Sequence, residues 1–254
     1  MHEFGEELLK AGDLDPVYNA LHKVDRFEVP RTQLRRLLLS YWCCYNLGES
    51  AWISEQDDYW GAMGDMAENV IEAPIGGRWP RGRERRHFRG KAAVKSIDYL
   101  SKKYPEPETA VYYLEGLKKY EIVRNRVKEW PMFGPWIAFK VGDMLERVLG
   151  DPLDFTDSDV FFFDSPQKAA ELWAGYAGGK HAIRQACAFL EEKLSDFKAP
   201  PSYDRKLGIQ EFETILCKWG SHKSGHYPVG IDTRELQESL HQWAKVSPTA
   251  AGML

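Results

Sequence analysis

The sequence predicts an all-α protein, and two observations carry the prediction. Apolar residues recur at helical spacing along most of the chain, for example at Ala138, Val141 and Leu145. Alternating patterns typical of strands are absent, since the one candidate, residues 160–163, is too short. We therefore expect about ten helices. They would form a single domain over residues 1–254, or two closely packed helical lobes.

Caps and turn residues mark where the expected helices begin and end. Asp15 followed by Pro16 indicates a capped helix start, and Ser165 followed by Pro166 indicates another. The glycine pair 178–179 separates that second helix from the next. The expected helices span residues 16–26, 30–46, 52–71, 87–103, 106–130, 135–149, 166–177, 181–197, 208–219 and 233–245. The irregular segments, where functional residues often lie, are 73–86, 150–164, 198–206 and 220–232.

Composition excludes several classes of protein. The net charge of −4 argues against a globally basic nucleic-acid coat protein, while nine tryptophans could fill cores or stack on bases. Four cysteines without a CxxC pair indicate reduced thiols. Residues 1–15 lack the apolar core of a signal peptide, and no stretch is long enough to cross a membrane. We therefore expect a cytoplasmic protein.

Residues 120–149 contain the pattern of a helix-hairpin-helix DNA-binding element. A helix ending at Trp130 is followed by a short turn and by a helix that Pro135 opens. The pattern of DNA-repair glycosylases (hydrophobic-Pro-Gly-hydrophobic-Gly-x-x-x-Ala) matches here except at Met132, where the first glycine would stand. Free amides at a helix start can bind a phosphate, although an ordinary helix connection explains the pattern equally well. The candidate DNA-binding residues are Phe133, Gly134, Pro135, Trp136 and Lys140.

Residues 78–91 form a basic segment with seven Arg or Lys residues and one Glu. Arginine can bind a phosphate through two parallel hydrogen bonds, and glycine-rich backbone can add amide donors. A solvated charge run is the alternative, but Trp79, Phe88 and the repeated glycines are unusual in such runs. The segment therefore predicts an anion site for DNA or for a phosphorylated leaving group. Its candidate ligands are Arg81, Arg85, Arg86, His87 and Arg89.

Residues 151–160 are rich in aspartate and follow the hairpin at about the distance at which helix-hairpin-helix glycosylases carry their catalytic carboxylate. The residues from Asp157 to Val160 resemble the Asp-Thr-His-Val element of those enzymes, with Asp157 in the catalytic place and Asp159 replacing histidine. Trp136 stands where bifunctional glycosylases carry a lysine, which excludes Schiff-base chemistry from that position. The alternative is a capping loop whose aspartates accept backbone hydrogen bonds.

Residues 213–232 concentrate polar side chains that a helix connection does not ordinarily need. Cys217 lacks an adjacent base and is expected to be a small buried residue rather than a nucleophile. The carboxylates and histidines fit no standard metal-site spacing, so no metal ligands are assigned. Glu213 is a further candidate catalytic carboxylate. The candidate phosphate- or substrate-binding residues are Lys218, Lys223, His226, Tyr227 and Asp232.

Three motifs taken together resemble a known family. They are the WP-x-F-G-P-W-IAFK hairpin, the upstream RWPRG-x-ERRHFRG segment, and the downstream E-x-x-LCKW and GHYPVGID segments. Their combination is similar to the phage amino acid:DNA transferases, also called α-glutamyl/putrescinyl thymine pyrophosphorylases. The resemblance covers residues 30–245 and implies a helical fold like that of the glycosylases.

The resemblance also implies a reaction. An amine from an amino acid or polyamine would displace pyrophosphate from 5-pyrophosphorylmethyl-deoxyuridine in double-stranded DNA, after a DNA base kinase has acted. The target base would leave the duplex stack, and the hairpin would hold the DNA backbone. Asp157 would accept the amine proton. The arginines of residues 78–91, with Lys218 or Lys223, would stabilise the departing pyrophosphate, with Mg²⁺ as an optional cofactor.

Two other functions remain open at this point. A base-excision glycosylase would use Asp157 on the N-glycosidic bond, but Met132, Asp159 and residues 213–232 would then be unexplained. A non-catalytic helix-hairpin-helix module would tolerate Asp157→Asn and Glu213→Gln without loss of function.

Overall fold

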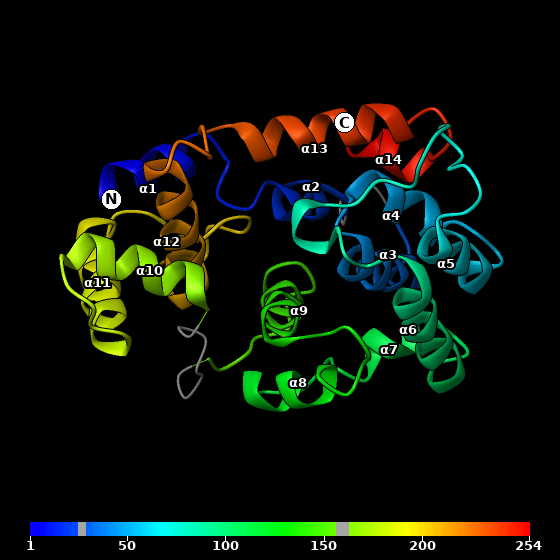
Figure 1. Ribbon diagram of the computed structural model, residues 1–254, viewed down its shortest axis with the longest axis horizontal. Coiled ribbons are helices and arrows are strands. Elements are labelled where there is room, and N and C mark those ends of the chain that lie inside the picture. The colour runs from blue at the N-terminus through cyan, green and yellow to red at the C-terminus, as the bar shows by residue number, and fades with distance from the viewer. Residues whose placement is uncertain (25–28, 156–162) are drawn as a thin grey trace. The chain divides into compact units, whose positions relative to one another are not determined.

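The computed structural model describes residues 1–24, 29–155 and 163–254 and confirms the all-α prediction (Figure 1). Within these ranges the regular structure is helical, and no β-strand forms. An isolated antiparallel bridge joins Lys198 and Lys206. None of the helices in this part of the chain has the length and apolar character that a membrane crossing requires.

The chain divides into two compact units. Unit 1 combines Met1–Asn19 with Asp154–Arg234, and unit 2 combines Ala20–Leu153 with Glu235–Leu254. Helices α2 (Pro16–Val24) and α13 (Ile231–Trp243) contribute residues to both.

Unit 1 is built from α1 (His2–Lys10), α10 (Asp164–Ala174), α11 (Lys180–Lys193) and α12 (Ile209–Lys223). Helix α10 packs closely on α12, because Gly220 leaves so little room that an added Cβ would lie 3.1 Å from Ala169 Cβ. The apolar faces of these helices form one core, whose fully buried members include Leu8, Ile183, Leu190, Ile215 and Leu216.

Unit 2 contains the remaining helices. They are α3 (Arg31–Cys44), α4 (Leu47–Ser54), α5 (Tyr59–Glu68), the short 3₁₀ helix η1 (Arg83–Arg85), α6 (Gly90–Lys103), α7 (Glu108–Tyr112), α8 (Tyr120–Val127), α9 (Pro135–Arg147) and α14 (Pro248–Gly252). Trp42, Trp79, Trp130 and Trp243 are buried in this unit, so much of the tryptophan content fills its core. Trp136, by contrast, is only half-buried.

Several predicted helix boundaries need correction. The helix predicted at 52–71 is two helices, because Asn46 caps α4 through the Glu49 amide and Asp58 caps α5 through the Gly61 amide. The helix predicted at 106–130 is interrupted after α7, where Gly116 adopts a φ of 78°. Helices α1 and α14 were not predicted. Helix α12 runs to Lys223, four residues beyond its predicted end.

Candidate functional site

The segment predicted to form the hairpin folds in unit 2 as α8, a loop over residues 128–134, and α9, which packs on α8. Pro135 occupies the first turn of α9, as the sequence predicts. Trp130 is buried in the loop and its ring lies 5.2 Å from that of Phe133, edge to face. Met132 has a φ of 65°, the left-handed conformation that favours glycine. Met132, which stands where the glycosylase pattern has its first glycine, thus has a backbone conformation that favours glycine.

Gly134, the residue before α9, is exposed and has an extended backbone with φ −80° and ψ −175°. Neither its conformation nor its described surroundings require glycine, since an added Cβ would meet no atom of the described residues within 4 Å. The first-turn amides of α9 have no intrahelical partners. The geometry therefore leaves room for a ligand to approach the backbone closely at the start of α9.

An aromatic surface adjoins this helix start. The Trp136 ring lies 5.2 Å from that of Tyr45, and Tyr45 stacks on Tyr41 at 4.6 Å between ring centroids. Tyr41 is buried, whereas Tyr45 and Trp136 are half-buried. Flat aromatic faces of this kind can stack on a nucleic-acid base.

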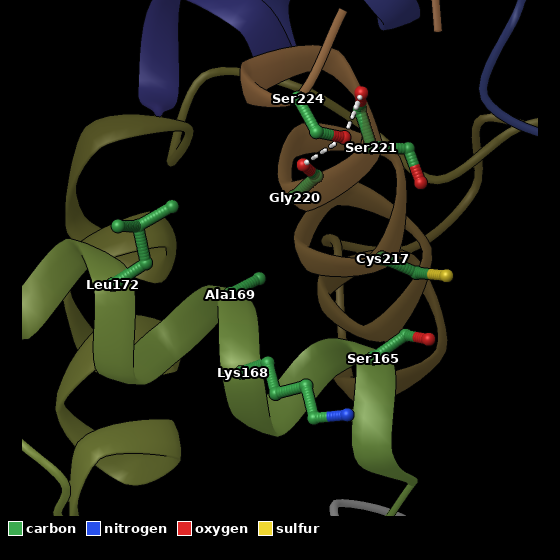
Figure 2. A pocket seen from close by; sticks show the side chains of 8 residues that line it. All are labelled: Ser165, Lys168, Ala169, Leu172, Cys217, Gly220, Ser221 and Ser224. Carbon is green, nitrogen blue, oxygen red and sulfur yellow. Dashed lines mark hydrogen bonds between the residues drawn. The ribbon is translucent and has the colours of Figure 1, made fainter. Parts of the chain in front are cut away.

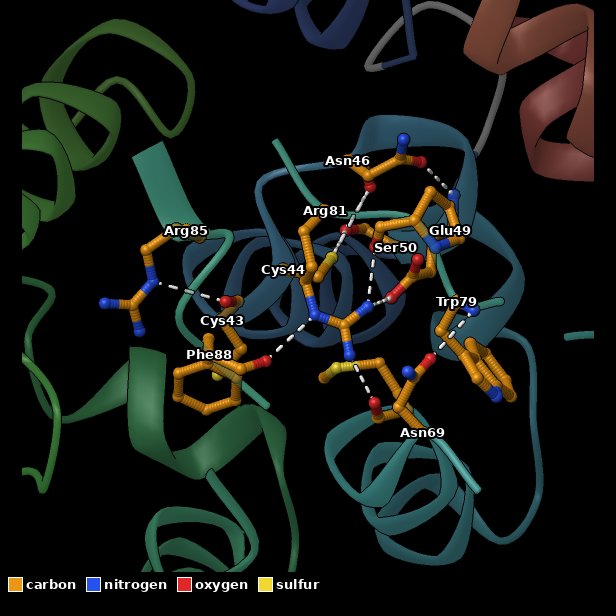
Figure 3. A network of polar contacts seen from close by, with 12 residues as sticks. Cys43, Cys44, Asn46, Glu49, Ser50, Asn69, Trp79, Arg81, Arg85 and Phe88 are labelled. Atoms are coloured by element: carbon orange, nitrogen blue, oxygen red, sulfur yellow. Dashed lines mark hydrogen bonds and ion pairs between the residues drawn. The ribbon is translucent and has the colours of Figure 1, made fainter. Parts of the chain in front are cut away.

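The basic segment 78–91 divides its side chains between the interior and the surface. The Arg81 side chain is only 1% exposed, and Figure 3 shows its polar contacts. Its guanidinium pairs with Glu49 at 3.0 Å and donates to the carbonyl oxygens of Phe88 at 2.9 Å and of Met66. Gly82 lies directly against Tyr45, where a Cβ would overlap the carbonyl oxygen. Arg81 therefore attaches the segment to α4 and α5, and in this conformation its guanidinium is not open to an anion.

Arg85 is also buried, although it was predicted to bind phosphate. Its guanidinium donates to the carbonyl oxygens of Cys43 at 3.2 Å and Met132 at 2.9 Å. Arg86, His87 and Arg89 are exposed. Burial, together with the charges of Arg85 and Arg86, lowers the pKa of His87, so this imidazole is neutral at pH 7 and adds no positive charge. The cations available to an anion from this group are Arg86 and Arg89.

Lys140, a predicted DNA contact, is also inside unit 2. It lies with Asp143 and Arg147 on one face of α9, and all three side chains are at least 90% buried. Its Nζ is 3.9 Å from Asp143 Oδ2, and the Arg147 guanidinium is 3.5 Å from the same oxygen. This position suits a buried ionic cluster better than a surface phosphate contact.

The C-terminal polar residues converge in unit 1 on Asp13, which the sequence analysis did not single out. Tyr227 Oη donates to Asp13 Oδ2 at 2.7 Å and also lies 3.0 Å from Asp232 Oδ2. The Thr233 amide and hydroxyl donate to Asp13 Oδ1, and the Gly230 amide donates to Oδ2. Asp13 thereby holds the start of α13. Its partners lie more than 200 residues away in the chain, which is why no local signal indicated it.

A cation, Lys218, lies beside both Asp13 and Asp232. Lys218 donates to the Asp13 carbonyl oxygen at 2.5 Å and pairs with Asp232 at 2.7 Å. Burial opposes ionisation of Asp13, but hydrogen bonds from Tyr227 and Thr233 and the charge of Lys218 hold its pKa below the usual value. Burial and the neighbouring carboxylates raise the pKa of Tyr227, which stays a hydrogen-bond donor. In this geometry Lys218, Tyr227 and Asp232 form a network that links α12 and the start of α13 to Asp13.

The other predicted residues of this segment are dispersed. Glu213 is 3% exposed and lies 3.4 Å from the Thr214 hydroxyl, whereas Lys223 and His226 are exposed. Cys217 is half-buried rather than buried. It lines a pocket of about 220 Å³ between α10 and α12, together with Lys168 and Ser221 (Figure 2).

The candidate catalytic residues Asp157 and Asp159 lie outside the described residues, so their roles stay predictions from the sequence. Within the described ranges, no group of three or more His, Cys, Asp or Glu side chains is arranged to hold a metal ion.

An all-helical scaffold with an open helix start, exposed arginines and half-buried aromatic rings is typical of helical proteins that act on DNA. Comparison with known proteins gives the particular family. The profile of the amino acid:DNA transferase family matches residues 9–227. The chain is 44% identical over 274 aligned residues to a glycinyltransferase of Pseudomonas phage PaMx11, covering 98% of this chain and 93% of that protein.

A second relative, a putrescinyltransferase of Delftia phage PhiW-14, is 29% identical over 253 residues, covering 93% of this chain and 77% of the relative. The chain therefore belongs to the amino acid:DNA transferase family. It is a transferase of DNA hypermodification.

Proposed function

We propose that this protein transfers glycine, through its amino nitrogen, onto 5-pyrophosphorylmethyl-deoxyuridine in DNA, with release of pyrophosphate. The observation that carries the choice of glycine is the 44% identity to a glycinyltransferase over nearly the whole of both chains, against 29% to a putrescinyltransferase. The choice of 5-pyrophosphorylmethyl-deoxyuridine as the substrate base rests on the three sequence motifs that resemble the family. A kinase acting on DNA bases must supply this substrate, because the leaving group is a pyrophosphate ester.

In the proposed reaction, the glycine nitrogen forms a bond to the methylene carbon on C5 of the base. The bond from that carbon to the pyrophosphate oxygen breaks, and the oxygen keeps the electron pair. The nitrogen must be unprotonated to attack and must lose a proton afterwards, which is work for a general base. From the sequence, Asp157 is our candidate for that base, and Asp159 is the neighbouring alternative.

The described part of unit 2 supports the proposed DNA contact. Arg86 and Arg89 are exposed and can neutralise backbone phosphates, while the open start of α9 at Gly134 can accept another. The half-buried rings of Tyr45 and Trp136 offer a stacking surface for a base that has left the duplex. These groups hold and orient DNA. The electrostatic part of the binding that the arginines contribute does not depend on the base sequence.

A pyrophosphate-release assay tests the proposal. Duplex DNA carrying 5-pyrophosphorylmethyl-deoxyuridine is incubated with the protein and with glycine, putrescine or no amine. We expect pyrophosphate release with glycine, little with putrescine, and none from unmodified DNA. Abasic sites without pyrophosphate would instead identify a glycosylase. DNA binding without any turnover would identify a binding module.

A further inference from the structure

We infer that Arg85 is a positioning residue that holds the hairpin loop 128–134 in the shape required for DNA binding, and that it does not itself contact phosphate. The inference rests on the proposed DNA contact of this hairpin. It assigns different tasks to Arg85 and Arg86, two neighbouring arginines that the sequence presents as equivalent.

Arg85 connects two elements of unit 2 that are far apart in the sequence. Its Nε donates to the carbonyl oxygen of Cys43, in the last turn of α3, where carbonyl groups lack intrahelical partners. Its Nη1 donates to the carbonyl oxygen of Met132 in the hairpin loop. The loop is thus attached to the end of α3 through one rigid guanidinium.

Aromatic rings fix the guanidinium in place. Its carbon lies 4.7 Å from the ring centroid of Phe88 and 5.1 Å from that of Phe133. Phe133 follows Met132 in the hairpin loop, so two consecutive loop residues contact Arg85. The side chain is 2% exposed, and its Nη2 has no hydrogen-bond partner among the described residues. Because this nitrogen is buried, a phosphate cannot reach it in the conformation described.

The conformation of Met132 explains why such support is needed. A left-handed backbone is unfavourable for a residue with a side chain, because Cβ approaches the following carbonyl oxygen. Met132 nevertheless has a φ of 65°. Arg85 binds the Met132 carbonyl oxygen, and Ser96 Oγ donates to the preceding carbonyl, that of Pro131, at 2.6 Å. The two bonds hold the loop that leads into the first turn of α9.

Salt dependence of DNA binding separates a positioning residue from a phosphate ligand. Each phosphate contact contributes about 0.9 to the slope of log K against log salt concentration. We would measure binding of a modified duplex over a range of salt for the wild type, Arg85→Met and Arg86→Met. Methionine keeps an unbranched chain between the rings of Phe88 and Phe133, and Arg86→Met is the matched exposed control.

We expect Arg85→Met to weaken binding by roughly tenfold with an unchanged slope, since the loop loses its shape and no phosphate contact is lost. Arg86→Met is expected to make the negative slope shallower by about one, because one phosphate contact is lost. Adding Met132→Gly to Arg85→Met should restore much of the affinity, because glycine adopts the left-handed backbone without support. Met132→Gly alone should bind like the wild type.

A slope that becomes shallower by about one in Arg85→Met would identify a phosphate ligand and overturn the inference. Failure of Met132→Gly to restore the affinity of Arg85→Met would overturn it too. If Arg86→Met and Arg89→Met also leave the slope unchanged, the proposed DNA contact of this surface fails instead. Should Arg85→Met not fold, Arg85→Lys provides the same test. Its ammonium can reach one carbonyl but cannot bridge both, so we expect weaker binding that Met132→Gly improves, again at constant slope.

Discussion

At the scale of single residues, burial divides the arginines of segment 78–91 between support and binding. The side chains of Arg81 and Arg85 point inward. The Arg81 guanidinium pairs with the Glu49 carboxylate, and the Arg85 guanidinium contacts a carbonyl oxygen and an aromatic ring. Arg86 and Arg89 stay in water. Sequence alone predicted a basic segment but could not assign these directions, because they depend on partners contributed by α3, α4 and α5.

The buried pair of Arg81 and Glu49 gives a stability prediction. Burial raises the pKa of Glu49 to about 8, and the charge of Arg81 is what favours its ionised form. Arg81→Met removes this partner and also the donor to the carbonyl oxygens of Phe88 and Met66, and we expect a loss of about 3–5 kcal/mol in the free energy of unfolding. The double variant with Glu49→Gln should lose less than the sum of the single variants. Urea denaturation measures this. The exposed pair of Arg83 and Glu235 provides the control, since Arg83→Met should cost less than about 1 kcal/mol. Equal losses at the two sites would contradict the account.

Asp13 gives a pH-dependent prediction. The pKa of Asp13 in the folded protein lies below its usual value of 3.8. The ionised carboxylate therefore stabilises the fold fully above pH 3.8, and this stabilisation is lost as the pH falls from there through the folded pKa. We expect Asp13→Asn to cost about 2–4 kcal/mol near neutral pH. The difference from the wild type should shrink in acid below pH 3.8. Denaturant unfolding across this range checks it, with the exposed Asp196→Asn as control. A difference that persists unchanged in acid would exclude the ionised carboxylate as the source.

At the scale of elements, the start of α9 carries the proposed DNA contact. Gly134→Ala should leave the fold intact, costing at most about 1 kcal/mol, because the added methyl group meets no protein atom and the backbone is already extended. It should nevertheless weaken DNA binding by roughly tenfold, because the methyl group would stand where the phosphate approaches.

Gly64 in α5 offers a matched comparison for this variant. It also has no atom within 4 Å of an added Cβ, and Gly64→Ala should leave DNA binding unchanged. Electrophoretic mobility shift or fluorescence anisotropy, with thermal unfolding in parallel, measures both effects. Wild-type affinity in Gly134→Ala would remove the start of α9 from the DNA contact.

The local signals predicted most of the helices, and their failures have physical causes. Pro135 marked the start of α9 correctly because a first-turn proline acts locally. The breaks before α5 and after α7 were missed, since apolar spacing continues across Asp58 and Gly116. Asp58 nevertheless caps the start of a new helix, α5, and the left-handed Gly116 follows the end of α7. The Asp13 network was missed because its partners are distant in the chain.

At the scale of the whole molecule, the family resemblance read from three motifs is confirmed by the family match over residues 9–227. The identity of the amine, unlike the family, does not follow from the family match. It depends on how a small substrate is selected, and glycine rests on similarity to a glycinyltransferase rather than on any one side chain described above. The function is therefore tested most directly by its product.

The decisive measurement is mass spectrometry of nucleosides from DNA that carries 5-pyrophosphorylmethyl-deoxyuridine. The DNA is first incubated with the protein, isotope-labelled glycine and an equal concentration of unlabelled putrescine. We expect a nucleoside in which labelled glycine is joined through its nitrogen to the 5-methylene group, with one pyrophosphate released per adduct. A putrescine adduct in its place would contradict the assignment of the amine. Recovery of the starting nucleoside alone would contradict the transfer reaction itself.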